Sequence, residues 1–151
     1  FPYTTLFRSD KEPEARTAYE FMKNTTVEQI GFVDHPAIAM SGASPDGLVG
    51  EDGLIEIKCC NTATHLEVLM SQEIDPDYLT QIQWQLACTK RQWCDYVGYD
   101  PRLPAHLQLF IKRVERNQRT IIELETEVSG FIRELDAQIA RLPQPQQEIA
   151  A

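Results

Sequence analysis

The spacing of apolar residues divides the chain into segments with helical periodicity and segments typical of strands. Where apolar residues recur every three or four positions, we expect helices, because that spacing places them on one helix face. The predicted helices are 10–24, 62–72, 77–90 and 118–142. Short β-branched and aromatic runs that end at turn residues predict strands instead. The predicted strands are 27–33, 41–49, 54–60, 93–99 and 107–114, with the second and third joined as a hairpin.

The order of these elements, α-β-β-β-α-α-β-β-α, predicts one α/β (α+β) domain with a mixed β-sheet flanked by helices. A chain of 151 residues is long enough for one such domain with a hydrophobic core. We place the domain at residues 10–142. Its last helix carries a long apolar stripe that predicts packing on the sheet or on a partner. The stripe consists of Ile121, Leu124, Val128, Phe131, Leu135, Ile139 and Leu142.

The two ends of the chain are expected to lie outside this domain. Residues 1–9, FPYTTLFRS, have neither helical nor strand periodicity, and they resemble the conceptual translation of a DNA-sequencing adapter. We therefore expect a non-native segment and exclude it from the fold; an ordinary disordered arm is the alternative. Residues 143–151 contain two prolines and several glutamines and predict a frayed tail.

Composition narrows the class of protein. No apolar run approaches the roughly 18 residues of a membrane span, and no signal peptide is visible, so we expect a soluble, cytoplasmic protein. The cysteines at 59, 60, 88 and 94 do not match the spacing of a metal knuckle, which predicts reduced, mostly buried thiols. The net charge of −9 argues against a nucleic-acid partner, unless divalent metal masks some acid and basic residues gather on one surface.

The predicted hairpin contains the residues most suggestive of chemistry. Glu56 and Lys58 share one face of the strand 54–60 because side chains alternate along a strand. We expect a three-residue loop, 51–53, with Gly53 at its left-handed position. That register pairs Leu48 with Glu56 and Asp46 with Lys58, so the two acids and the lysine converge. A two-residue loop would send Asp46 to the opposite face.

Two close carboxylates beside a lysine suit phosphodiester hydrolysis. The carboxylates repel each other, and a hard divalent cation with oxygen ligands relieves that repulsion. Such a cation polarises a phosphoryl oxygen and acidifies water, while a lysine offsets developing charge. Glu-x-Lys alone is more often a half-solvated sheet face with an ion pair, and Asp-Gly segments are usually turns. Pro-Asp followed about ten residues later by Glu-x-Lys is far more specific.

This pattern resembles the PD-(D/E)-x-K nuclease motif, and further segments extend the resemblance. They are Glu12-Pro13-Glu14-Ala15-Arg16, Ser44-Pro45-Asp46-Gly47-Leu48, Leu54-Ile55-Glu56-Ile57-Lys58-Cys59, Tyr78-Leu79-Thr80-Gln81-Ile82-Gln83 and Tyr99-Asp100-Pro101-Arg102. In this order and spacing they are similar to lambda exonuclease and the YqaJ-like viral recombinases, over roughly residues 11–142.

The resemblance implies roles for individual residues. Asp46 and Glu56 correspond to metal-binding carboxylates, Lys58 to the catalytic lysine, and the Ile57 carbonyl to a further metal ligand. Glu12 corresponds to an acidic metal ligand on the preceding helix; without the resemblance it is an exposed first-turn acid, with Pro13 in that same turn. Gln81 corresponds to a glutamine that positions water or phosphate; alone, Gln81, Gln83 and Gln85 predict a polar helix face. Tyr78 either lines the same cleft or is an ordinary core or rim tyrosine.

For the whole protein, the resemblance implies a restriction-endonuclease-like fold and a Mg²⁺-dependent exonuclease, with Mn²⁺ able to substitute. The expected substrate is linear double-stranded DNA, digested 5′→3′ in phage-type recombination. A ring-shaped homotrimer and a single-strand annealing protein are the implied partners, in a phage or prophage protein of the bacterial cytoplasm. Relatives carry further N-terminal helices with basic residues, which we expect to be missing here.

Two other classes of function stay open from the sequence. One is another nuclease of the superfamily, such as a nicking or repair endonuclease, and the other is a non-catalytic DNA-binding or assembly domain with the same fold. The sequence also leaves open which basic residues meet DNA, since surface solvation is the default for each. The candidates are Arg91, Arg102, Lys112, Arg113, Arg116 and Arg119.

Overall fold

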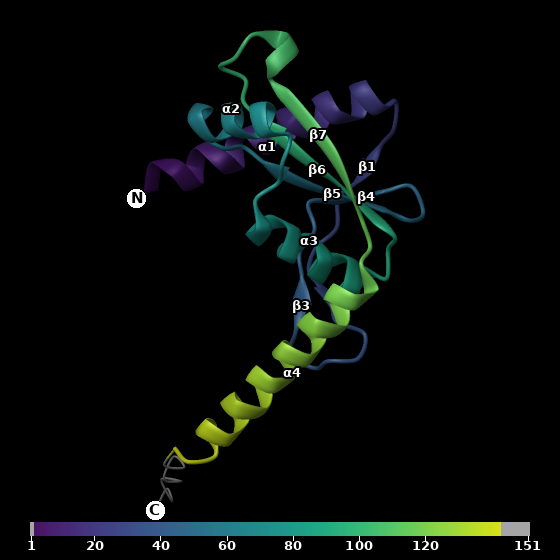
Figure 1. Cartoon of the computed structure of the whole chain (residues 1–151), viewed down its shortest axis with the longest axis vertical. Helices are drawn as coiled ribbons and strands as arrows, with labels where there is room; N and C mark the ends of the chain where they lie inside the picture. Colours follow the sequence, from purple (N-terminus) through teal and green to yellow (C-terminus); the bar gives the residue numbers. More distant parts are fainter. Residues whose placement is uncertain (1, 143–151) are drawn as a thin grey trace, which may run out of the picture.

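The computed structural model describes residues 2–142, with side chains from residue 11 onward. A five-stranded sheet forms its centre, in the order β1-β4-β5-β6-β7, and a two-stranded ribbon of β2 and β3 lies below it (Figure 1). β5 and β6 are parallel and the other neighbours are antiparallel, so the predicted mixed sheet is confirmed. The sheet strands are β1 (Val27–Glu28), β4 (Gly47–Val49), β5 (Gly53–Lys58), β6 (Trp93–Tyr99) and β7 (Leu109–Glu115).

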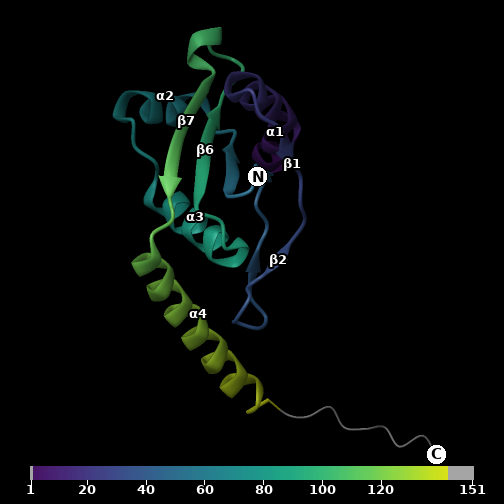
Figure 2. The same ribbon diagram turned by 90° about the vertical axis from the view of Figure 1, so that its right-hand side faces the viewer.

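The described residues also form four helices, as predicted. They are α1 (Pro2–Lys23), α2 (Thr62–Ser71), α3 (Pro76–Thr89) and α4 (Gln118–Ile139), and a short 3₁₀ turn, η1 (Ala105–Leu107), precedes β7. α1 lies on one side of the sheet, and α2 and α3 lie on the other (Figure 2). Within residues 2–142, no helix has the length and apolarity needed to cross a bilayer.

Two predicted strands are each divided in the structure. Segment 27–33 yields β1 and β2 (Val33–Asp34), and segment 41–49 yields β3 (Gly42–Ala43) and β4. The reason is a change of partner: β1 pairs with β4 in the main sheet, whereas β2 pairs with β3 in the ribbon. A hydrophobic pattern reports which residues are β-formers, but it does not report where a strand leaves one sheet for another.

α1 differs from its predicted range because it begins at Pro2 rather than near residue 10. Residues 2–9 are therefore helical, and Pro13 lies inside the helix rather than in its first turn. Apolar periodicity records which face is buried against a neighbour, so a helical stretch can lack it. Whether residues 1–9 derive from an adapter stays a prediction, and the predicted tail at 143–151 lies outside the described residues.

Two hydrophobic clusters pack against the two faces of the sheet. Ile55, Ile57 and Val97 face α1 and contact Ala15 and Tyr19. On the opposite face, Leu54, Tyr96 and Phe110 pack against Ile82 and Leu86 of α3. Full burial of each large side chain contributes about 1.5–3 kcal/mol, so α3 is held firmly against β5. Three of the four cysteines, Cys59, Cys88 and Cys94, are buried as expected.

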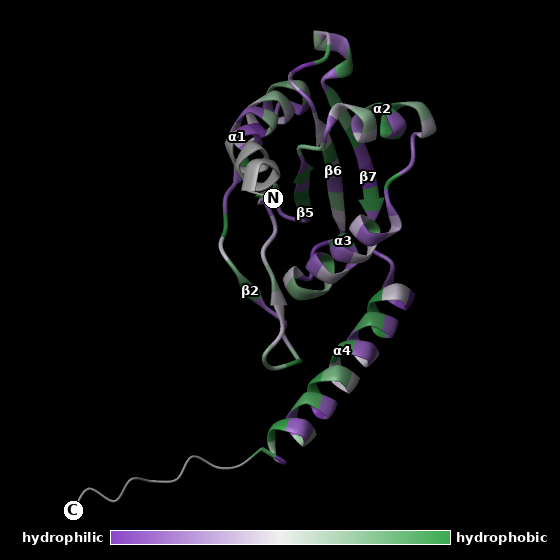
Figure 3. Ribbon diagram, turned by 90° about the vertical axis from the view of Figure 1, so that its left-hand side faces the viewer, coloured by the Kyte–Doolittle hydropathy of each residue, from purple (hydrophilic) through white to green (hydrophobic). Residues whose placement is uncertain are grey.

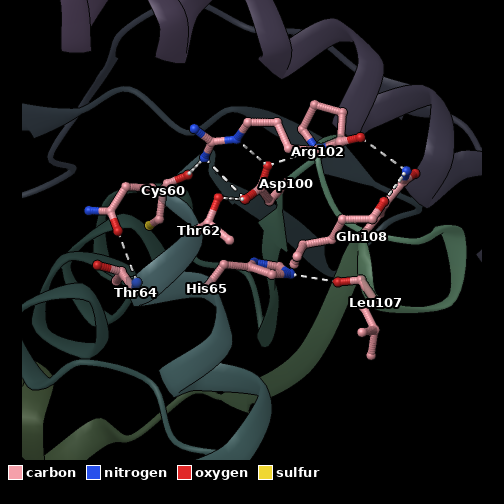
Figure 4. Close-up of polar contacts among 11 residues, drawn as sticks. Cys60, Thr62, Thr64, His65, Asp100, Arg102, Leu107 and Gln108 are labelled. Atoms are coloured by element: carbon pink, nitrogen blue, oxygen red, sulfur yellow. Dashed lines mark hydrogen bonds and ion pairs between the residues drawn. The ribbon is translucent and has the colours of Figure 1, made fainter.

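A buried acidic residue at the end of β6 fixes the start of α2 (Figure 4). Asp100 is fully buried, and its carboxylate accepts hydrogen bonds from Thr62 Oγ1 at 2.7 Å and Arg102 Nε at 2.7 Å. Burial alone would raise the pKa of Asp100, but these hydrogen bonds outweigh it and lower the pKa to about 2. His65 of α2 also contacts the Leu107 carbonyl of η1, at 2.9 Å. The Tyr99–Arg102 segment of the resemblance thus has a structural role.

α4 leaves the body of the molecule and presents alternating apolar and polar residues along its length (Figure 3). Ile121 is fully buried, whereas Phe131, Ile139 and Leu142 are half exposed or more. The predicted apolar stripe therefore packs on the body mainly at its first turn. Near that end, His35 of the β2–β3 ribbon lies 3.3 Å from the Glu125 carboxylate and stacks on Trp84 of α3.

Replacing Asp100 with alanine is expected to lower the free energy of unfolding by about 3 kcal/mol, because Thr62 and Arg102 lose their buried acceptor. The pKa of Asp100 is lower in the folded chain than in the unfolded chain, so its stabilisation is present above about pH 4. It is lost as the pH falls towards 2. Urea denaturation of wild type and variant at pH 7 and pH 3 measures both effects.

Asp136→Ala provides the control, since Asp136 is exposed on α4 and its loss should change stability by at most about 0.5 kcal/mol. An Asp100→Ala variant as stable as Asp136→Ala contradicts the structural role.

Candidate active site

The hairpin of β4 and β5 carries the predicted acidic residues, but its register differs from the expected one. Leu48 lies opposite Leu54 rather than opposite Glu56, and the loop is 50–52 rather than 51–53. Gly50, with a φ of 55°, takes the left-handed position that we had assigned to Gly53. Gly53 belongs to β5, where a Cβ atom would lie 2.2 Å from the Trp93 indole. The expected register was therefore wrong by two residues.

This shift leaves the acids together because side chains alternate with a period of two. Gly47 pairs with Ile55, so Asp46, one residue before β4, comes level with Glu56 rather than Lys58. Its carboxylate reaches the backbone of β5, where Oδ2 accepts a hydrogen bond from the Ile57 N–H at 2.6 Å. The convergence of Asp46, Glu56 and Lys58 on one hairpin thus survives the error.

Arg91 holds this turn in place from the loop after α3. Its guanidinium Nη1 donates to the Gly50 carbonyl at 2.9 Å and to the Gly53 carbonyl at 2.8 Å. The Gly50 carbonyl belongs to the first loop residue and the Gly53 carbonyl follows the loop, so one side chain ties both ends of the turn. The hairpin geometry therefore does not depend on the loop residues alone.

Glu56 is the central acid of the site and is almost completely buried, at 2% exposure. The Lys58 ammonium donates to its Oε1, and Gln81 Nε2 donates to the same oxygen at 2.9 Å. The Gln81 carbonyl oxygen in turn accepts from Lys58 Nζ at 3.1 Å. The structure thus brings together three of the predicted catalytic residues in one closed hydrogen-bonded triangle.

Gln85 also contacts Glu56, which the sequence did not predict. Its Nε2 donates to Glu56 Oε2 at 2.6 Å, and the side chain is buried at 1% exposure. Gln83 is buried too, but it binds the Glu115 carbonyl and the Asn117 N–H. The expected polar helix face is therefore partly wrong, because only Gln81 of the three is exposed. The one available signal was the four-residue spacing of Gln81 and Gln85, which places both on one face of a helix.

Tyr78 borders the site and also packs on the core. Its ring lies 4.7 Å from Lys58 Nζ and stacks on Tyr96 at a centroid distance of 6.0 Å. A cation over an aromatic face is attracted by the ring quadrupole. Tyr78 is thus a half-buried residue that contacts the predicted catalytic lysine, and its place in a cleft for DNA stays a prediction.

The negative charges of the site perturb one another. Burial, and after it the nearby charges of Glu56 and Glu12, raise the pKa of Asp46 to about 7, against the opposing effects of the Ile57 N–H and Lys58. A carboxyl group that is half protonated near neutral pH lies where its charged form is disfavoured, here by burial first and then by neighbouring negative charge. A cation placed between Asp46 and Glu56 would relieve this repulsion.

Glu12 is close enough to influence Asp46, but it is bound elsewhere. Its Oε1 forms an ion pair with Arg16 Nη2 at 2.6 Å, one turn further along α1. Among the side chains described, those of residues 11–142, no group of three or more His, Cys, Asp or Glu is arranged to hold a metal ion. The structure therefore brings Asp46 and Glu56 together without gathering Glu12 into the same cluster.

Two carboxylates are sufficient for one kind of metal. Mg²⁺ commonly binds one or two protein carboxylates and completes its shell with waters and substrate phosphates. Asp46 and Glu56 supply hard oxygen ligands in a region of excess negative charge, so the residues present fit Mg²⁺. Nothing in the geometry tests whether the Ile57 carbonyl is a further ligand, and that role stays a prediction.

The basic residues considered for DNA contact all bind within the chain. Arg113 forms two hydrogen bonds to the buried Asp95 and lies 3.5 Å from the centroid of Trp93. Lys112 donates to the Gln72 carbonyl, and Arg119 pairs with Glu123. Arg91, Arg102 and Arg116 likewise bind backbone carbonyls. These side chains are used first to stabilise the fold.

The sequence and the fold match a known family and known structures. Residues 7–92, more than half of the chain, match the model of the YqaJ-like viral recombinase domain. An alkaline exonuclease from Laribacter hongkongensis, LHK-Exo, is 52% identical with a TM-score of 0.87, over 88% of this chain and 69% of that chain. Its structure in complex with dAMP matches with the same identity and TM-score, over 88% of this chain and 68% of that chain. No curated protein sequence matches the chain.

A more distant structure supports the fold alone. The phage-related exonuclease from Haemophilus somnus 129PT is 13% identical, with a TM-score of 0.76 over 92% of this chain and 73% of that chain. The resemblance inferred from the sequence motifs is thus confirmed by a family match that contains Glu12, Asp46, Glu56, Lys58 and Gln81. This chain belongs to the YqaJ-like viral recombinase family.

Proposed function

We propose that this protein is a metal-dependent exonuclease that hydrolyses phosphodiester bonds at the ends of linear double-stranded DNA. The observation that carries the proposal is the convergence of Asp46 and Glu56 beside the Lys58 ammonium. The alkaline exonuclease LHK-Exo, 52% identical to this chain, supports the same activity. Its complex with dAMP, a deoxynucleoside monophosphate, is consistent with a DNA substrate.

Each residue of the site has a chemical role in this proposal. Asp46 and Glu56 would hold the cation, which we take to be Mg²⁺ with Mn²⁺ able to substitute, and the Ile57 carbonyl would be a third ligand. When bound, the cation supplies Lewis acidity that polarises the phosphoryl oxygen and acidifies water. Glu12 is available as a further ligand if its side chain turns away from Arg16.

Lys58 and Gln81 act on the reacting groups rather than on the cation. The Lys58 ammonium lies at the mouth of the site, where it can orient water and offset negative charge that develops on the phosphoryl group. Gln81 is exposed and bridges Glu56 and Lys58, so its amide is placed to position water or phosphate. Tyr78 lines the same rim and is proposed to contact DNA.

The finer properties of the enzyme follow from the family and belong to the same proposal. We propose 5′→3′ digestion, a homotrimer in the full-length protein, and cooperation with a single-strand annealing protein in phage-type recombination. Residues 10–142 would form the nuclease core, in a phage or prophage protein that acts in the bacterial cytoplasm.

Substrate topology tests the proposal. With Mg²⁺, the protein is expected to degrade 5′-phosphorylated linear duplex DNA and to leave a closed circular duplex of the same sequence intact, as measured by gel electrophoresis. EDTA should stop the reaction. Ca²⁺, with its looser coordination geometry, should permit binding without turnover. Cutting of the closed circle would instead indicate an endonuclease of the superfamily.

Glu56→Gln and Asp46→Asn are the decisive variants in that assay. Each keeps the size of the side chain and removes a metal-binding charge, so the rate of hydrolysis should fall by about 10³-fold or more, equivalent to several kcal/mol. Glu51→Gln is the matched control, because Glu51 is an exposed acid in the same hairpin turn. Equal activity of Glu56→Gln and Glu51→Gln contradicts the assignment of the site.

The burial of Asp46 and its repulsion by Glu56 predict that Asp46→Asn stabilises the metal-free protein at pH 8. The pKa of Asp46 is raised by folding, so its contribution to stability is fully present below about pH 4 and is lost as the pH rises through about 7. At pH 8 the variant should therefore unfold with a free energy about 1–3 kcal/mol higher than wild type, and the difference should shrink at pH 5.

Urea denaturation in EDTA at both pH values measures this difference. Addition of Mg²⁺ should reverse the order at pH 8, because the cation stabilises only the chain with both carboxylates. A variant that is less stable than wild type in EDTA at pH 8 contradicts the inferred repulsion.

A further inference from the structure

The Gln85 amide is buried, and among the described residues its nitrogen has a hydrogen-bond partner but its oxygen does not. The side chain lies on α3 at 1% exposure, and its Nε2 donates to Glu56 Oε2 at 2.6 Å. Its carbonyl oxygen Oε1 is buried and accepts no hydrogen bond from the residues that the structure describes. An unsatisfied buried acceptor is unfavourable, so packing alone would favour an apolar side chain of similar size at this position.

The neighbouring Gln83 shows what a purely structural glutamine does on the same helix. It is also buried, at 6% exposure, and it uses both ends of its amide: Nε2 donates to the Glu115 carbonyl and Oε1 accepts from the Asn117 N–H. Those bonds tie α3 to the link between β7 and α4. Gln85 makes no comparable tie within the described part of the chain, since its amide bonds to a single side chain, Glu56.

The three donors to Glu56 divide between its two carboxylate oxygens. Lys58 and Gln81 both donate to Oε1, on the exposed side where Gln81 meets solvent. Gln85 is the donor to Oε2 and comes from the buried side. With Lys58 and Gln81 alone, the carboxylate would be held through one oxygen and could rotate about its last side-chain torsion.

We propose that Gln85 is a positioning residue that sets the orientation of the Glu56 carboxylate for metal binding. The inference rests on the proposed metal-dependent activity. By holding Oε2 on the buried side, Gln85 keeps Oε1 directed towards Lys58, Gln81 and the open part of the site. A cation bound by Glu56 would compete with Lys58 for that oxygen, and the bond from Gln85 to Oε2 would keep the carboxylate from turning.

The test is the affinity of the full chain for Mn²⁺, measured by calorimetry without DNA, in wild type, Gln85→Met and Gln83→Met. Methionine matches glutamine in length and removes the amide. Loss of a hydrogen bond to a metal-binding group typically weakens metal binding about 10- to 100-fold, so we expect that loss for Gln85→Met. Its DNA hydrolysis at low Mg²⁺ should fall, and much of it should return at high Mg²⁺.

Gln83→Met should behave in the opposite way. It loses two hydrogen bonds that join α3 to the β7–α4 link, so its thermal unfolding midpoint should fall while its Mn²⁺ affinity stays within about twofold of wild type. This crossed result separates a positioning role from a general loosening of α3, which would weaken Mn²⁺ binding in both variants.

Three results would overturn the proposal. The first is Mn²⁺ binding by Gln85→Met within twofold of wild type, and the second is equal weakening by Gln83→Met. If Gln85→Met does not fold, Gln85→Asn replaces it: its shortened amide cannot reach Oε2 at hydrogen-bond distance, and an unchanged Mn²⁺ affinity is again contrary. The third is wild-type protein that binds no Mn²⁺, which overturns the proposed metal-dependent function as well.

Discussion

The structure is organised around one costly feature, the burial of the Glu56 carboxylate in the middle of the sheet. An ionised carboxylate removed from water costs several kcal/mol unless charges and hydrogen-bond donors compensate it. Glu56 lies on the same face of β5 as the fully buried Leu54. An apolar residue in place of Glu56 would pack there without this desolvation cost. Its compensation comes from Lys58 on its own strand and from Gln81 and Gln85 on α3. The charge is therefore tolerated only if α3 docks in one orientation on the sheet.

That orientation is determined by hydrophobic packing rather than by the site itself. Ile82 and Leu86 are fully buried against Leu54 and Tyr96, and each lies next to a glutamine that reaches Glu56. The burial of Ile82 and Leu86 stabilises the domain and also directs the Gln81 and Gln85 amides towards Glu56. The energetic cost of this arrangement falls on Asp46: burial first, and then the charge of Glu56, disfavour its ionised form and raise its pKa. Such a penalty for a buried charge is typical of binding sites, where some folding stability is lost so that a ligand is bound more tightly.

The limits of sequence-based prediction here follow from what each signal reports. Alternation along β5 placed Glu56 and Lys58 on one face, and an error of two residues in the hairpin register did no harm, since the pattern repeats every two residues. The error arose because the sequence offers two glycines for one left-handed position. Gly50 takes it, whereas Gly53 is needed where the Trp93 indole approaches the backbone, a contact that the sequence alone does not reveal. Gln85 was missed for a related reason. Its burial depends on a neighbouring strand, and a helix pattern cannot reveal it.

The ion pair between Glu12 and Arg16 bears on how a chain with a net negative charge can act on DNA. A net charge of −9 is unfavourable for a DNA enzyme, and the arginines near the sheet are used internally, as Arg113 is with Asp95. Arg16 is different because its partner, Glu12, is itself a candidate metal ligand beside Asp46. A cation bound in this region would offset the negative charge of Asp46, Glu56 and Glu12, so the acidic composition and the proposed DNA substrate are compatible.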